Sequence, residues 1–516
     1  MRPAAIAASR SVTGATVVGV AGLMIASGWM IADEHTKALS IAIAAIGLCA
    51  LALTQRGALL GLLLVAALNG IPFISTSQPV ISKLTVADFS IIALFLTAVL
   101  WLLLDNGTYR PTGIGQAISR AAVVLLLWWC FTVVRSVTAQ RVPALHAISF
   151  GRDFLYFALL LLVLPRVRLE RRDISALICT LTVAVCIFAT GQIATATGLG
   201  QPGTLIHFEY TVQQTDLTRV YARMTDLVTA GLAVSLAAIL LTRQRRVRII
   251  AIPVGTLLLL STIVQLTRAR WIGLVVGFFL VSLWFTVHNQ AGISAALRRR
   301  LTIVVGVVGI LGIAALIAAP GALPGGTIVH RALSIVSGIE SNTGTIAVRE
   351  TATKTTTTYL TGEWPLGLGF IPPSSHYFAG LPEGSIRDSD LGVLNAVVTM
   401  GIVGAVLIYF PVIATLINCL RRLSMQRHRR YAWLRYGGAI WIVATLASSI
   451  TLATLFSVGG LALTAVFLTF LAHPSVAGEP LPRTTVRLGQ FPPAIVTAER
   501  GVGLGRPRAR AETASR

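Results

Sequence analysis

Apolar residues occur along most of the chain in long runs, and the short segments between the runs carry most of the charge. Runs of roughly 17 to 25 residues have the length that an α-helix needs to cross the hydrocarbon core of a bilayer. Inside lipid such a run must be helical, because lipid cannot satisfy the hydrogen-bonding groups of the backbone. The pattern predicts spans at 12–32, 38–54, 57–74, 86–104, 121–138, 148–165, 174–197, 225–242, 249–266, 271–288, 301–319, 391–418, 436–454 and 457–472.

These spans predict an all-α fold, a polytopic transmembrane helical bundle of about 12 to 14 helices with fourteen preferred. The 148–165 span is the weakest prediction, because Arg152 and Asp153 lie near its start. The last two spans are also compatible with one broken hairpin. The predicted organisation is N-terminal transmembrane helices at 1–319, a large extracytoplasmic loop at 320–389, C-terminal transmembrane helices at 390–472 and a disordered tail at 473–516.

Charge predicts the orientation of the bundle. With the N-terminus in the cytoplasm, the inner segments carry a net charge of +23 and the outer segments carry none. This is the excess of Lys and Arg that marks cytoplasmic loops. The apolar run from Val12 to Ala32 is long for a signal peptide, so we expect a retained first span. We therefore expect a multi-pass protein of the inner (plasma) membrane with both termini in the cytoplasm and membrane lipids as partners.

Composition excludes several classes of function. The chain is 55% hydrophobic and only 12% charged, about half the charged fraction of a soluble domain. Its net charge of +23 does not indicate a nucleic-acid partner, because the basic residues lie at the ends of apolar runs. The five Cys fall inside or at the ends of spans and the eight His are scattered, so we expect neither a metal centre nor a cofactor. No Walker loop, HExxH or GxSxG motif is present.

The informative charges lie on the predicted outer side, where Arg is less expected. Arg268 and Arg270 fall between two spans that are joined by almost no loop, so both are held at the level of the membrane surface. One interpretation is that they extend to the interface beside Trp271. The other is a fixed cation that binds an anionic lipid headgroup such as a diphosphate, because the planar guanidinium group matches phosphate oxygens.

Further candidates lie in the two long outer segments. Arg219 and Arg223 are spaced to share one helix face, and His376 lies between aromatic and small residues. The simpler alternatives are solvated charges for the arginines, a structural His376, and helix capping for carboxylates that precede a span. The candidates of the larger loop are Arg349, His376, Arg387, Asp388 and Asp390.

These residues resemble the O-antigen ligase and polymerase superfamily of membrane glycosyltransferases. The segment from Thr267 to Gly273 is similar to that family's Ser-Arg-Gly motif, with Arg268 in the Arg position. Ser341-Asn342, Arg349 and Trp364-Pro365-Leu366-Gly367-Leu368-Gly369 resemble the family's loop. Asp88, which opens the fourth predicted span, also looks family-like.

The end of the loop departs from the family pattern. The family has a His about eleven residues before a Gly-x-x-Gly in the next span, and Gly401-Ile402-Val403-Gly404 matches that end. The position of the His is occupied by Asp390, and Ala269 replaces the Gly of the first motif. The resemblance covers about half of the chain, roughly 86 to 420, and the departures favour a polymerase-like or divergent member over a close relative of the ligases.

The resemblance implies transfer of a glycan from a polyprenyl-diphosphate carrier to a glycan or lipid acceptor, without metal or nucleotide sugar. Diphosphate is a good leaving group, so it needs cations more than a strong acid. Arg268 and Arg349 are the candidates to hold it, with Arg387, Asp388, Arg219 and Arg223 as further binding residues. The acceptor hydroxyl needs a base, for which Asp390 is the first candidate and His376 the second.

Two other functions fit the same sequence. A transporter (flippase) for lipid-linked oligosaccharides would also have 12 to 14 spans, but it should carry ionisable residues along a central pathway. A non-catalytic scaffold of an envelope-assembly complex is the third hypothesis, with the inner Arg clusters and the tail as binding surfaces.

Overall fold

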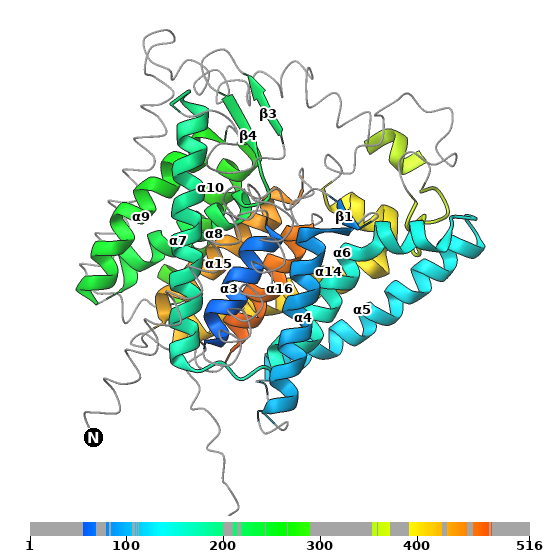
Figure 1. Ribbon diagram of the computed structural model, residues 1–516, viewed down its shortest axis with the longest axis horizontal. Coiled ribbons are helices and arrows are strands. Elements are labelled where there is room, and N and C mark those ends of the chain that lie inside the picture. The colour runs from blue at the N-terminus through cyan, green and yellow to red at the C-terminus, as the bar shows by residue number, and fades with distance from the viewer. Residues whose placement is uncertain are drawn as a thin grey trace, which may run out of the picture. The chain divides into compact units, whose positions relative to one another are not determined.

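Apolar α-helices make up most of the described chain (Figure 1). The computed structural model describes residues 55–68, 79–81, 84–105, 109, 111, 113–199, 210–213, 218–242, 244–265, 267–288, 353–358, 360–371, 392–425, 431–450, 458–473 and 476. The longer helices are α3 (Arg56–Ala67), α4 (Val86–Leu104), α5 (Gly113–Thr138), α6 (Ala144–Val163), α7 (Arg171–Ala196), α8 (Thr225–Leu241), α9 (Arg245–Val264), α10 (Arg268–His288), α14 (Val393–Met425), α15 (Ala432–Ser448) and α16 (Val458–Ala472).

The chain is a multi-pass helical membrane protein. Among the described residues, six helices are long and apolar enough to cross a membrane, namely α4, α5, α6, α7, α9 and α14. Shorter apolar helices lie at Arg56–Ala67, Thr225–Leu241, Ala269–Phe285 and Gly460–Ala472. The total of fourteen spans stays a prediction, because the spans at 12–32, 38–54 and 301–319 lie outside the described residues.

Each remaining predicted span overlaps a described helix, and residues 69–74 and 451–454 of two of these spans lie outside the described part. The agreement is closest for α4, and α5 starts earlier than predicted, at Gly113. The 148–165 span, the weakest prediction, is the intact helix α6. A short 3₁₀ turn, Leu164–Arg166, with Pro165 inside it, ends that helix.

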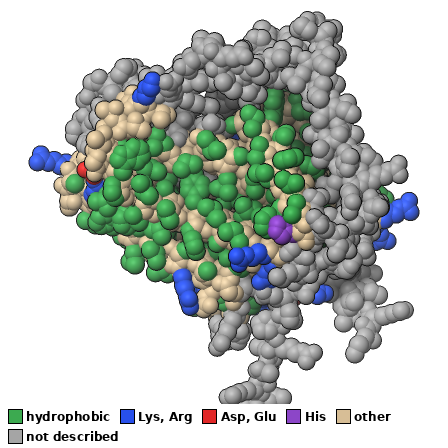
Figure 2. All heavy atoms as spheres, turned by 180° about the vertical axis from the view of Figure 1, so that it is seen from behind, with side chains coloured by type: hydrophobic (Ala, Val, Ile, Leu, Met, Phe, Trp, Pro, Cys, Tyr) green, Lys and Arg blue, Asp and Glu red, His purple; other side chains and the backbone are tan. Residues whose placement is uncertain are grey.

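The bundle buries an apolar interior and exposes an apolar exterior. Leu64, Leu94, Phe157 and Leu468, from α3, α4, α6 and α16, are fully buried in one continuous core. Hydrophobic side chains also cover much of the described part of the face drawn in Figure 2, with basic residues at its margins. Leu103 lies on the apolar helix α4 and is 68% exposed, as expected for a helix face that contacts lipid. An apolar surface on both sides of a helix is what a bilayer solvent permits.

Small residues bring α10 and α15 together. Gly273 and Gly277 lie one turn apart on α10. A Cβ on Gly273 would come 2.5 Å from the Ala444 carbonyl oxygen, and one on Gly277 would come 2.5 Å from that of Ile440. Such small-xxx-small pairs let the backbones of membrane helices approach closely. Substitution of either glycine would therefore separate the two helices.

Two short antiparallel ribbons interrupt the helices: β1 (Pro79–Ile81) with β2 (Leu84–Thr85), and β3 (Tyr210–Gln213) with β4 (Thr218–Tyr221). The predicted helix face of Arg219 and Arg223 is wrong. Arg219 lies in β4 opposite Val212, and Arg223 lies in the turn before α8. The β-branched and aromatic residues of this segment favour a strand over a helix.

Candidate functional site

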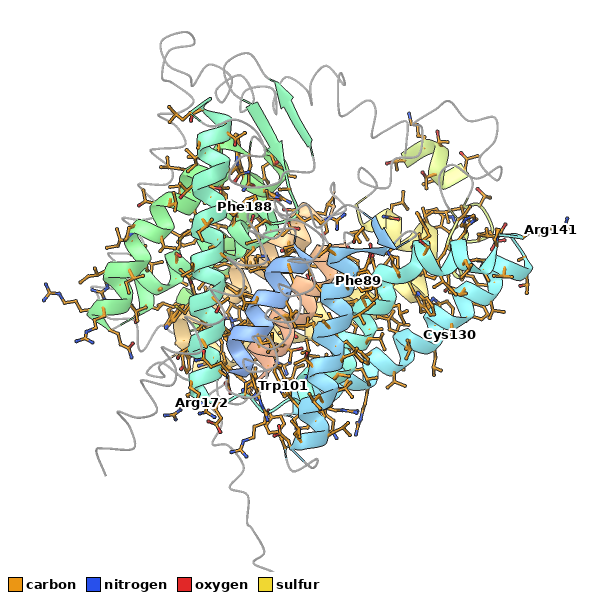
Figure 3. All side chains as sticks on the ribbon, in the orientation of Figure 1. Phe89, Trp101, Cys130, Arg141, Arg172 and Phe188 are labelled. Carbon is orange, nitrogen blue, oxygen red and sulfur yellow. The ribbon has the colours of Figure 1, made fainter. Side chains whose placement is uncertain are left out.

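Polar contacts gather at the two ends of the helices. The Asp88 layer, named here for Asp88 and its neighbours, includes Arg152, Asp153, Arg223, Asp226 and Arg270. The Arg56 layer, at the other end, includes Arg56, Asp105, Leu169 and His473. In Figure 3, Phe89 and Trp101 lie toward opposite ends of α4, and Arg172 lies near the end that carries Trp101. Helix ends that lie on the same side of the membrane in the predicted order of spans therefore lie in the same layer.

Asp88 is fixed at the start of α4 by the local sequence. Thr85 is the N-cap residue, and the Thr85 side chain and Asp88 form a reciprocal capping box. The Thr85 backbone N–H and hydroxyl donate to Asp88 Oδ2 at 2.7 and 2.8 Å. The Asp88 side chain is 0% exposed, so these bonds replace water around one carboxylate oxygen. The other oxygen, Oδ1, is left to face α6.

α6 supplies the partner of Asp88. Arg152 Nε lies 3.3 Å from Asp88 Oδ1 and 3.9 Å from Asp153 Oδ1. Asp153 Oδ1 is buried and accepts no hydrogen bond from the described residues. Arg223, in the turn before α8, lies within electrostatic reach of Asp153. The four side chains place two carboxylates and two guanidinium groups at the junction of three segments.

A second ion pair holds the start of α10. Arg270 Nη2 donates to Asp226 Oδ1 at 2.6 Å, and both side chains are about one-sixth exposed or less. The Trp271 indole N–H donates to the Thr262 carbonyl oxygen at 2.8 Å and closes the tight turn from α9. Arg270 is therefore paired with a carboxylate of a neighbouring helix. Arg268 is the first residue of α10, and its side chain lies outside the described part.

The 360–371 segment, named here the strap, packs against a break in α14. Gly401 has φ 71° and ψ 179° inside this helix, a conformation that only glycine adopts readily. The break leaves backbone groups without helical partners, and the strap supplies them. The N–H groups of Leu368 and Gly369 donate to the carbonyls of Val398 and Thr399, and Ile402 N–H donates to the Trp364 carbonyl. Trp128 on α5 donates to the Met400 carbonyl at 2.8 Å.

Side chains of α5 hold the other edge of the strap. Arg135 donates to the Gly367 carbonyl and pairs with Glu363. The Phe370 N–H donates to the Ser136 hydroxyl at 2.8 Å. The Phe370 ring packs against Gly151, where a Cβ would approach it to 2.5 Å. Because Gly151 directly precedes Arg152, the strap is packed against the part of α6 that carries the Asp88 partner.

Two of the motifs identified in the sequence are in contact in the structure. The Trp364–Gly369 turn contacts Gly401, the first residue of the Gly-x-x-Gly segment. A Cβ on Gly401 would lie 2.1 Å from the Pro365 carbonyl oxygen. Five predicted site residues lie outside the described residues: Arg349, His376, Arg387, Asp388 and Asp390.

Arg152 and Asp153 are, with Asp226, the residues of this layer that sequence analysis missed as site candidates. Arg152 and Asp153 had a signal in the sequence, because they are two adjacent charges inside a predicted span, where ionisable residues are expensive and need partners. The Thr-x-x-Asp spacing of Thr85 and Asp88 is likewise typical of an N-terminal capping box, here that of α4. Across the described residues, no group of three or more His, Cys, Asp or Glu is placed to hold a metal ion.

No protein-family model matches the sequence, and no curated protein matches it significantly.

Proposed function

We propose that this protein is a membrane glycosyltransferase that transfers or polymerises a polyprenyl-diphosphate-linked glycan on the extracytoplasmic face, in surface polysaccharide biosynthesis. The proposal includes fourteen spans, cytoplasmic termini and an Asp88 layer that faces outward. It needs neither metal nor nucleotide sugar, because the lipid diphosphate is itself the activated leaving group.

One observation carries the proposal. The two motifs behind the resemblance to the O-antigen ligase and polymerase superfamily, Trp364–Gly369 and Gly401–Gly404, are in direct contact, although nothing in the linear sequence requires it. They pack against α5 and α6 at the end of the bundle that holds the buried Asp88–Arg152 pair. A rigid strap beside a buried charge cluster is a suitable support for reactive loop residues.

The proposed roles follow the chemistry of the reaction. Arg268 and Arg349 hold the diphosphate and stabilise the charge that develops on it as the glycosidic bond breaks. Asp390 accepts the proton of the acceptor hydroxyl, with His376 as the second candidate. Arg387, Asp388, Arg219 and Arg223 bind the substrate around this centre.

The test uses a deletion strain complemented with wild type, Arg268→Ala or Asp390→Asn. Lipid-linked glycans are extracted, and the leaflet that holds them is read from digestion by an added external glycosidase. We expect the unconsumed donor to accumulate on the outer side in both variants at normal protein levels. Arg246→Ala is the matched control, because Arg246 is an exposed Arg at the other end of the bundle.

Two outcomes would overturn the proposal. Accumulation of donor on the cytoplasmic side would assign the protein to transport. Full polymer synthesis by a double variant of Arg268 and Arg349 would leave the scaffold as the better explanation.

A further inference from the structure

We propose that Asp153, with Arg152 and Arg223 beside it, forms a binding subsite for the uncharged, hydroxyl-rich part of a glycan. The inference rests on the proposed function, because it assigns the acceptor sugar to a place distinct from the diphosphate. None of the sequence motifs pointed to Asp153, and the subsite depends on the packing of α6 against α4 and the turn before α8.

The first reason is the state of the Asp153 carboxylate. Its Oδ1 atom is buried and has no hydrogen-bond donor among the described residues, and Arg152 Nε is 3.9 Å away. A buried carboxylate oxygen without a donor is costly, so such an atom calls for a ligand. The Asp153 side chain as a whole is 18% exposed, so it is not completely enclosed.

The second reason is the charge of the surroundings. The charged groups that act on Asp153 are Arg152, Arg223 and Asp88. The cluster therefore combines two carboxylates with two guanidinium groups, so hydrogen-bond acceptors and donors lie side by side. A diphosphate here would meet two carboxylates, and like charges at this range repel. A sugar avoids this repulsion, because its hydroxyls donate to the carboxylate and accept from guanidinium N–H groups.

The third reason is that the subsite is held rigidly. Asp88 is fully buried and fixed by its capping box, and it in turn holds Arg152. On the other side, Gly151 is packed against the Phe370 ring of the strap. Asp88 and Phe370 are therefore positioning residues, and Asp153 is the residue that contacts the glycan.

The test measures binding with the full-length protein in nanodiscs. The probe is the neutral glycan released by mild acid from the lipid-linked pool of the deletion strain, and inorganic diphosphate is the second probe. We expect Asp153→Asn to weaken glycan binding about tenfold or more, the effect of losing hydrogen bonds to a charged group. Diphosphate binding should stay unchanged. Asp105→Asn is the matched control, because Asp105 belongs to an ion pair in the Arg56 layer.

A second measurement on the wild type does not depend on how the variant folds. The glycan should protect Asp153, but not Asp105, from modification by a water-soluble carbodiimide. Any of three results would overturn the subsite. Asp153→Asn could bind the glycan with wild-type affinity, the glycan could fail to protect Asp153 from the carbodiimide, or the variant could lose only its binding of diphosphate. Loss of glycan binding in this variant, combined with inward accumulation of donor in the deletion strain, would retain the subsite and reject the transferase.

Discussion

The two polar layers use the same residue types in different ways. In the Asp88 layer, charged side chains pair inside the bundle, and the strap completes the broken backbone of α14. In the Arg56 layer, Arg56 and Asp105 form a bidentate pair at 2.6 and 2.8 Å. Arg172 in the same layer is 68% exposed, and its ion pair with Glu170 lies at the surface. Buried charges need fixed partners, whereas exposed ones need only water. In the proposed function, the Asp88 layer supports the reactive loop residues, whereas no such role is proposed for the Arg56 layer.

The largest effect is expected from the Asp88 ion pair. Asp88→Ala removes the cap of α4 and leaves Arg152 without its buried counter-charge, so we expect a loss of about 3 to 5 kcal/mol. Asp105→Ala breaks a pair whose side chains are 22% and 17% exposed, so solvent screens both partners and the loss should be about 1 kcal/mol. Thermal unfolding of both purified variants in one detergent checks the difference. Equal losses would remove the distinction between the two layers.

The next effect is expected at the break in α14. Gly401→Ala forces a side chain into a conformation that excludes it and places a Cβ 2.1 Å from the Pro365 oxygen. We expect a loss of about 3 kcal/mol and faster amide exchange in 360–371. Gly113→Ala is the control, because a Cβ there would meet nothing within 4 Å. A Gly401→Ala protein as stable as this control would show that the strap does not depend on the break.

The smallest effect is expected in the Arg56 layer, at His473 just after α16. Burial lowers the pKa of His473 to about 4, and its Nε2 accepts the Leu169 N–H while its ring stacks on Tyr109. The unfolded chain, with a pKa near 6.5, binds the proton more readily. Stability is therefore complete above about pH 6.5 and falls as the pH decreases toward 4, by about 2 kcal/mol at pH 5.

His473→Gln measures this contribution separately, because glutamine does not ionise in this range. We expect the variant to lose stability at pH 7.5 but to lose the pH dependence as well. If its unfolding temperature still falls by the wild-type amount between pH 7.5 and pH 5, another group is responsible for the acid sensitivity.

Helix positions were predictable because hydrophobicity is a local property. The spans at 86–104 and 225–242 agree with α4 and α8 to within a residue. The Arg219–Arg223 face was wrong because a three-to-four-residue spacing in a short polar segment does not exclude a strand. Arg270 was predicted to extend to the interface in one of two interpretations, and its partner Asp226 lies on another helix, where spacing along the chain gives no signal.

The sequence by itself determined the membrane class, the places of the described helices and the grouping of their ends. Each of these follows from the length of apolar runs and from where the charges flank them. Only the tertiary structure decided that Arg152 meets Asp88, and that Arg135 on α5 holds Gly367, which is 232 residues away in the sequence. Lipid is as apolar as the helices, so hydrophobicity does not select which helices pack together. Glycine contacts and buried polar groups select them, and both act only once the chain is folded.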